Sequence, residues 1–263
     1  MSAPRRLRFV EENYPEILEL ADAFLATKNL RGFDWPKWCC LPLTVWAEMV
    51  ELNCKTESRL ETINRVYEIM APATWRYSRG DYEFEPELYR DLLESEFSGK
   101  LPVQTLLSLP EWCVYIKTPF LSDAESDIDG FFAMLNLDTQ TGRHEFRIFL
   151  DRVGAQDYLS SIPIFLEDCD LDESVERMLA ASERNMRSHN FKFDRKGTRK
   201  KLQSCMQLAK HLLPLVIYLC MNPSEIENLT DPGQPLPPKP SPRKGRNRLR
   251  VTLPKKTTNY MVV

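Results

Sequence analysis

The stretches WCVYIK (residues 112–117), GFFAMLNL (130–137) and EFRIFL (145–150) decide the fold class of this chain. Each is short and rich in aromatic and branched residues, and a turn-prone stretch separates it from the next, which is the pattern of neighbouring strands. We expect an antiparallel meander. A further strand, SIPIFL (161–166), should lie at an edge of the sheet, because Pro163 has no N–H to donate to a central ladder.

Helical periodicity dominates the sequence on both sides of these strands. Residues 1–108 repeat apolar side chains at helical spacing, and Pro72 should end one of the helices there. Two more helices are expected over 172–230. The second of them carries apolar residues over 202–220 on nearly every side, so it should be buried. The predicted fold class is α+β, with a helical N-terminal part and a central antiparallel meander packed on C-terminal helices.

The predicted domain organisation is one compact domain followed by a tail. The domain covers residues 1–230, helical over 1–108, strand-rich over 109–166 and helical over 172–230. Residues 231–263 are expected to be a proline-rich basic linker and tail. From Pro232 onward there are eight basic residues and no acidic one, so the acidic body before it has a balance of −11. The apolar end of the tail suggests a cut before a further C-terminal region.

Composition and motifs argue against catalysis and against a cofactor. The three histidines stand in no nucleophile-elbow or zinc-ligand pattern, and the nine glycines form no phosphate-binding loop. Residues 125–136 match a calcium loop only loosely, because Asn136 stands where a bidentate glutamate is needed. Seven scattered cysteines without a C-x-x-C pair favour free thiols in a reducing compartment. We therefore expect a cytoplasmic protein that is not an enzyme, with no metal, no cofactor and no membrane span.

Candidate peptide-binding residues follow from chemistry alone. An acidic body attracts a cationic partner, and aromatic side chains supply the anchors of many interfaces. The candidates are the aromatic Tyr115, Phe131 and Phe132, together with the acidic Asp127, Asp129, Glu167 and Asp170. Two alternatives stay open: the aromatic residues could form core, and the acidic residues between 167 and 173 could cap a helix.

The basic tail is the candidate for contact with nucleic acid or with the ribosome. Its candidate residues are Arg243, Lys244, Arg246, Arg248 and Arg250. Flexible basic arms bind phosphate backbones largely without sequence preference. A tail that only keeps the protein in solution is the open alternative.

The run LPEWCVYI (109–116) resembles the type V-A anti-CRISPR proteins of the second family, whose relatives also occur on plasmids and other mobile elements. Similar blocks follow in the same order at residues 130–133 and 212–220. The resemblance implies a protein that suppresses production of a type V CRISPR effector nuclease. It implies recognition of the effector's nascent N-terminal peptide, with loss of the encoding mRNA, in the cytoplasm of a bacterial host cell. The alternative is a plasmid-encoded nucleic-acid-binding accessory protein that acts through the basic tail.

Overall fold

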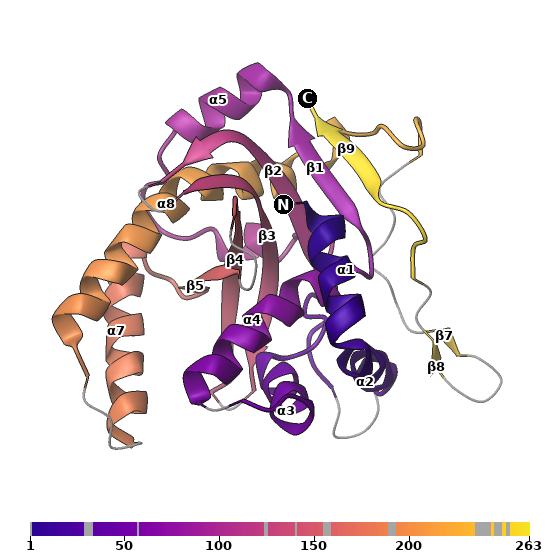
Figure 1. Ribbon diagram of the computed structural model, residues 1–263. Helices are drawn as coiled ribbons and strands as arrows, with labels where there is room; N and C mark the ends of the chain where they lie inside the picture. The colour runs from indigo at the N-terminus through magenta and orange to yellow at the C-terminus, as the bar shows by residue number, and fades with distance from the viewer. Residues whose placement is uncertain are drawn as a thin grey trace.

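The computed structural model describes residues 2–28, 34–56, 58–123, 126–139, 141–154, 159–188, 193–234, 243–244, 249–250 and 253–263. A seven-stranded sheet of order β5-β4-β3-β2-β1-β9-β6 lies between two layers of helices (Figure 1). The strands are β1 (Gly80–Phe84), β2 (Cys113–Ser122), β3 (Asp127–Asp138), β4 (Arg143–Arg152), β5 (Ser160–Phe165), β6 (Ile226–Asn228) and β9 (Thr258–Val262). A separate two-stranded pair, β7 (Arg243–Lys244) and β8 (Leu249–Arg250), lies outside this sheet.

The helices divide between the two faces of the sheet in chain order. One face is covered by α1 (Ala3–Asn13), α2 (Pro15–Ala26), α3 (Leu43–Asn53) and α4 (Arg59–Trp75). The other is covered by α5 (Pro86–Glu94), α6 (Val103–Leu106), α7 (Leu171–Ser188) and α8 (Arg195–Met221). The α+β class is therefore confirmed, and the N-terminal helices add a layer on the face opposite α8.

The expected antiparallel meander is present as β2-β3-β4-β5. Alternate residues of its strands enter different cores, because side chains in a strand point to opposite faces. Val114 and Ile116 pack against α5 to α8, whereas Tyr115 and Phe132 pack against α1 to α4. The strand with Pro163 is at the edge of the sheet, as the missing N–H of proline requires.

The C-terminal strand β9 corrects the predicted tail. Residues 258–262 pair in parallel with β1 over five positions and antiparallel with β6, so they belong to the main sheet. Tyr260 stacks on Tyr82 of β1 with ring centroids 4.8 Å apart, and both rings are buried. The apolar residues of the chain's end are thus part of the core, and the predicted boundary at residue 230 separates β9 from its own sheet.

Two prolines lie inside helices. Pro72 does not end its helix, because α4 continues to Trp75, and the expectation of a stop there is wrong. Pro214 lies within α8 and has no N–H for the carbonyl of Lys210, four residues earlier. The backbone N–H of Phe97, on the segment after α5, donates to that carbonyl at 2.8 Å. A distant segment therefore satisfies the acceptor that Pro214 leaves open.

Helix α8 is long and apolar enough to cross a membrane by length and composition alone. Its apolar side chains, among them Met206, Leu212 and Val216, are buried in the core against the sheet. Packing inside the protein accounts for these buried side chains.

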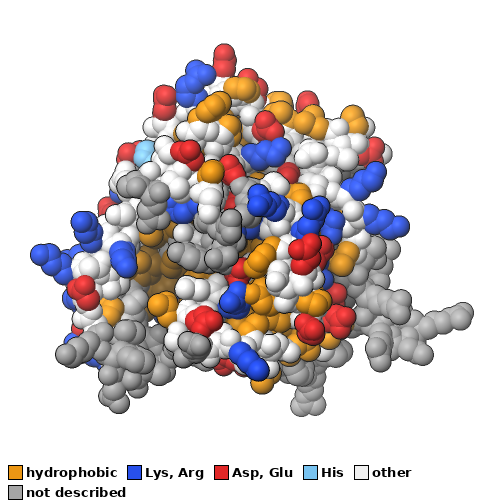
Figure 2. All heavy atoms as spheres, viewed as in Figure 1, with side chains coloured by type: hydrophobic (Ala, Val, Ile, Leu, Met, Phe, Trp, Pro, Cys, Tyr) orange, Lys and Arg blue, Asp and Glu red, His pale blue; other side chains and the backbone are white. Residues whose placement is uncertain are grey.

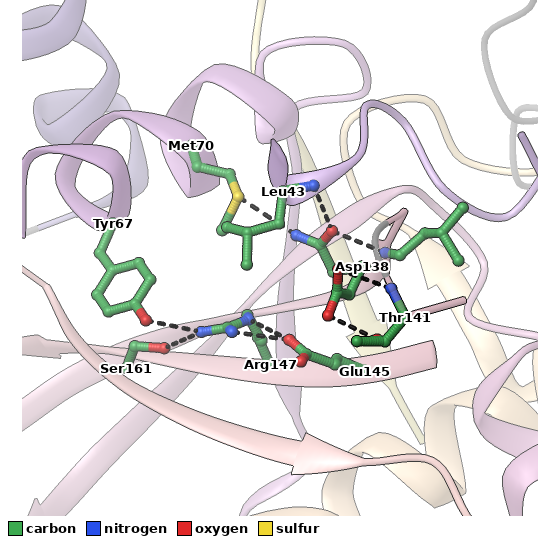
Figure 3. A network of polar contacts seen from close by, with 10 residues as sticks. Leu43, Tyr67, Met70, Asp138, Thr141, Glu145, Arg147 and Ser161 are labelled. Atoms are coloured by element: carbon green, nitrogen blue, oxygen red, sulfur yellow. Dashed lines mark hydrogen bonds and ion pairs between the residues drawn. The ribbon is translucent and has the colours of Figure 1, made fainter. Parts of the chain in front are cut away.

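A buried polar network fixes the layer formed by α1 to α4 to the sheet (Figure 3). Arg147 of β4 donates to Tyr67 Oη of α4 at 3.1 Å and to Ser161 Oγ of β5 at 3.3 Å. The same guanidinium lies 2.7 Å from Glu145 Oε2, and both side chains of this ion pair are almost completely buried. Buried charges require such partners, so the network fixes the position of α4 on the meander.

Candidate functional site

The residues of the LPEWCVYI run are structural. Glu111 is buried and accepts a hydrogen bond from Tyr82 Oη at 3.1 Å. Trp112 Nε1 donates to the carbonyl of Lys37 at 2.9 Å, and the ammonium of Lys28 lies 5.6 Å from the centroid of the Trp112 ring. Tyr115 Oη donates to Asp151 at 3.0 Å. The run connects the sheet to the loops around it and presents no binding surface.

The predicted aromatic anchors are all core residues. Phe131 and Phe132 are completely buried and Tyr115 is 2% exposed, so the prediction of surface anchors does not fit the structure. The physical reason is that helices cover both faces of the sheet, so both sets of alternating side chains are inside. The open alternative, that these aromatic residues form core, holds.

The predicted acidic rim is divided between the two ends of the meander. Asp127 and Asp129 lie at the start of β3, beside the β2–β3 hairpin. The register of β3 with β4 and of β4 with β5 places Phe165, and the residues that follow it, at the other end. Glu167 and Asp170 therefore cannot share a binding site at one end of the meander with Asp127 and Asp129.

Glu167 and Asp170 have structural partners. Glu167 forms ion pairs with Arg177 of α7 and, at 3.8 Å, with Arg143 of β4. Asp170 Oδ1 accepts a hydrogen bond from the backbone N–H of Glu173 at 2.7 Å, which caps the first turn of α7. Helix capping, the alternative reading of this acidic cluster, describes what Asp170 does here.

The hairpin end carries an exposed aromatic residue that the sequence patterns missed. Phe120 is fully exposed and has a φ of 64°, a left-handed conformation that is rare for a bulky side chain. Lys117 pairs with Gly130 and Leu121 with Ile128, so residues 118–120 stand opposite Asp129 alone. This bulge turns Phe120 out of the sheet. The available signal was an aromatic residue directly after Pro119, inside a turn-prone stretch.

Exposed charged and apolar residues lie at the same end of the sheet as Phe120. Asp127 and Asp129 have exposed side chains, and Val153 is 46% exposed. The backbone N–H of Val153 donates to the carbonyl of Asp127 at 2.9 Å, which places Val153 beside the hairpin. We call Phe120, Asp127, Asp129 and Val153 the hairpin surface. It combines an apolar anchor with two carboxylates, which suits a peptide with apolar and basic side chains.

An ion pair between Arg152 and Asp123 stabilises the hairpin. Arg152 of β4 donates two hydrogen bonds of 2.6 Å each to the carboxylate of Asp123, and bidentate pairs of this kind are strong and geometrically specific. The pair ties the loop that follows β2 to the end of β4. This ion pair thus holds the β2–β3 loop, beside the hairpin surface, against β4.

Other apolar side chains are exposed away from the hairpin. Figure 2 shows them gathered over the lower part of one face, where α3 and α4 lie. Leu52 at the end of α3 is 84% exposed, and Leu60 and Ile63 at the start of α4 are exposed as well. Helix α3 also carries the exposed Glu48 and Glu51, so this patch has acidic neighbours of its own, none of them from the predicted set.

Two buried carboxyls lie at the centre of the sheet, apart from both surfaces. Loss of solvent raises the pKa of Asp81 to about 7 and the pKa of Glu111 to about 7. The carboxylate oxygens Asp81 Oδ1 and Glu111 Oε2 have no hydrogen-bond partner among the described residues. A Cβ at Gly80 would lie 2.5 Å from Glu111 Oε1, so glycine is required there.

No group of three or more potential metal ligands is found within the described parts of the chain. Asn136, which stood at the decisive position of the loose calcium-loop pattern, is buried in β3. Its Oδ1 accepts a hydrogen bond from the backbone N–H of Leu43 at 2.8 Å. Asn136 therefore holds the start of α3 on the sheet.

The predicted basic contacts lie largely beyond what the structure describes. Arg246 and Arg248 are outside the described residues. Arg243, Lys244 and Arg250 lie in the small β7–β8 pair, where Arg243 is opposite Arg250. Their contact with nucleic acid or the ribosome stays a prediction.

Comparison with known proteins identifies a family and similar solved structures. A model of the AcrVA2-like family, described as the anti-CRISPR type V subtype A2 family, matches residues 82–262. A solved chain described as "Crystal structure of AcrVA2" is similar to the whole of this chain and to 84% of its own length, with a TM-score of 0.71 and 17% identity. At that identity the likeness concerns the fold. No curated protein matches the sequence.

Proposed function

This chain belongs to the anti-CRISPR type V subtype A2 family, whose model covers residues 82–262, and we propose that it recognises the nascent N-terminal peptide of a type V-A effector nuclease. Family membership makes it an anti-CRISPR protein directed at type V-A systems. In the proposed mechanism, recognition takes place during translation in the host cytoplasm and leads to loss of the encoding mRNA. The ribosome and the mRNA are then further partners.

The observation that supports peptide recognition is the full exposure of Phe120 beside Asp127 and Asp129. An exposed pair of opposite charges contributes only about 0–1 kcal/mol, so carboxylates alone give little affinity. Burying a phenylalanine ring contributes about 1.5–3 kcal/mol. Phe120 should therefore supply most of the binding free energy, while the acidic body speeds the approach of a basic peptide and selects for it.

The test is a fluorescence-anisotropy titration of the full chain with the labelled effector N-terminal peptide and with a scrambled peptide of the same composition. The effector peptide should bind with a micromolar or lower Kd and the scrambled peptide at least tenfold more weakly. Phe120→Asn should weaken binding by roughly tenfold to a hundredfold, which is the affinity equivalent of losing about 1.5–3 kcal/mol.

Leu52→Asn is the matched control, since it removes an exposed apolar side chain from the patch on α3 and should leave Kd unchanged. Asparagine adopts a positive φ more readily than phenylalanine, so Phe120→Asn should not lower the melting temperature. Equal binding of both peptides would refute the proposed recognition. Unchanged binding by Phe120→Asn would remove the hairpin surface from it.

A further inference from the structure

The two edges of the main sheet differ in their free backbone groups. At the β5 edge, Leu166 N–H donates to the backbone carbonyl of His144 at 3.0 Å. In an antiparallel ladder only alternate residues bond to the neighbouring strand, so Pro163, three residues earlier, faces away from β4. Pro163 has no N–H, so this edge lacks its central donor. Such a proline is a common protection of an edge strand.

The β6 edge has no such protection. Val263 N–H donates to the carbonyl of Glu225 at 3.0 Å, and Leu229 N–H donates to the carbonyl of Asn259 at 2.9 Å. These two bonds show which residues of β6 bond to β9 and which face away from it. Ile226 and Asn228, between these positions, direct their N–H and C=O groups away from β9. Within the described residues no strand pairs with that side of β6.

A hollow of about 970 Å³ lies along this edge. The turn after β6 forms one wall, and Asn228 Oδ1 holds the turn by accepting hydrogen bonds from the N–H groups of Thr230 and Asp231 at 3.1 and 2.9 Å. Leu229 in the hollow is 50% exposed, and the carboxylate of Glu227 is exposed beside it. The edge thus offers backbone pairing, an apolar contact and a negative charge together.

We propose that the β6 edge binds an extended peptide segment of a partner protein as an added strand, with a basic side chain at Glu227 and an apolar one at Leu229. Strand addition to a free edge takes its affinity from backbone hydrogen bonds and its selectivity from alternate side chains. A second copy of this chain paired through the centre of β6 is disfavoured. A two-fold pair of β6 strands centred on Glu227 would place the two Glu227 carboxylates opposite each other, and like charges in that position are destabilising.

The probe is a capped pentapeptide, Thr-Val-Thr-Lys-Thr, whose valine and lysine are two residues apart and so share one face of the added strand. It is titrated into isotope-labelled full-length protein and followed by amide resonances in NMR. Shifts should be confined to residues 226–234 and their β9 neighbours. N-methylation of one alternate set of peptide nitrogens should weaken binding at least tenfold, and N-methylation of the other set less than twofold, because only one set faces β6.

Charge selection is tested with Glu227→Lys, which should lose the lysine peptide and bind the corresponding valine–glutamate peptide. The same change at Glu87, exposed at the start of α5, should alter neither titration. Equal sensitivity to both N-methylated sets, absence of shifts near β6, or shifts centred on the hairpin surface would overturn the proposal. So would a peptide-independent dimer, seen by sedimentation, that the neutral variant Glu227→Gln strengthens, since this would assign the edge to a second copy.

Discussion

Replacing Glu111 with glutamine should remove much of the pH dependence of this protein's stability. The Glu111 carboxyl is buried beside Asp81, and burial raises its pKa to about 7 from an ordinary value of 4.5. The folded protein therefore holds this proton more tightly than the unfolded chain does. The free energy of unfolding is highest below about pH 4.5 and falls by about 3 kcal/mol as the pH rises through about 7.

Urea unfolding at pH 5 and pH 8 measures this difference. The wild type should be less stable at pH 8 by several kcal/mol, because Asp81 adds a contribution of the same sign. Glu111→Gln should reduce the difference by about 3 kcal/mol, since an amide does not ionise. Glu87→Gln, an exposed change of the same type, should retain the wild-type dependence. If Glu111→Gln retained it too, the assignment of a buried, protonated Glu111 would be wrong.

Three further substitutions test other parts of the fold by their midpoints in urea. Arg6→Met removes the guanidinium that lies 2.9 Å from the buried Asp151 carboxylate, and it should lower the free energy of unfolding by about 3–5 kcal/mol. The double variant Arg6→Met with Asp151→Asn should recover part of that loss. Gly130→Ala places a Cβ 2.6 Å from Tyr115 Oη and should cost about 1–3 kcal/mol, whereas an unchanged midpoint would contradict the packing. Asp170→Ala removes the cap of α7 and should cost about 0.5–2 kcal/mol, with Asp170→Asn, which keeps a capping oxygen, as its control.

The parts of the fold that the sequence predicts are those with local patterns. The meander could be recognised because its strands are consecutive and hydrogen-bond to their chain neighbours. Strand β1, with the sequence GDYEF, was not recognised, because it pairs only with distant strands. Strand β9 was assigned to a tail for the same reason, since its partner β1 is separated from it by most of the chain. Pairing at that distance leaves no periodic trace in the sequence.

The candidate site shows the same limit of prediction from sequence. Tyr115, Phe131 and Phe132 have the composition of both a core and a binding groove, and only the coverage of both sheet faces decides for the core. Asp127 and Asp129 were found because exposed carboxylates at a hairpin are visible in the pattern. Phe120 was missed because its exposure depends on a bulge, and a bulge is a property of the strand register.

The place of β9 in the sheet has a consequence for synthesis. It lies between β1 and β6, and both of these strands leave the ribosome before it does. Until residues 258–262 emerge, β1 has only one of its two parallel neighbours, and the ring of Tyr82 lacks its stacking partner Tyr260. Domains generally fold as units, and contacts between distant segments form slowly. A protein proposed to act on another chain during translation therefore completes its own sheet only after residue 262 has left the ribosome.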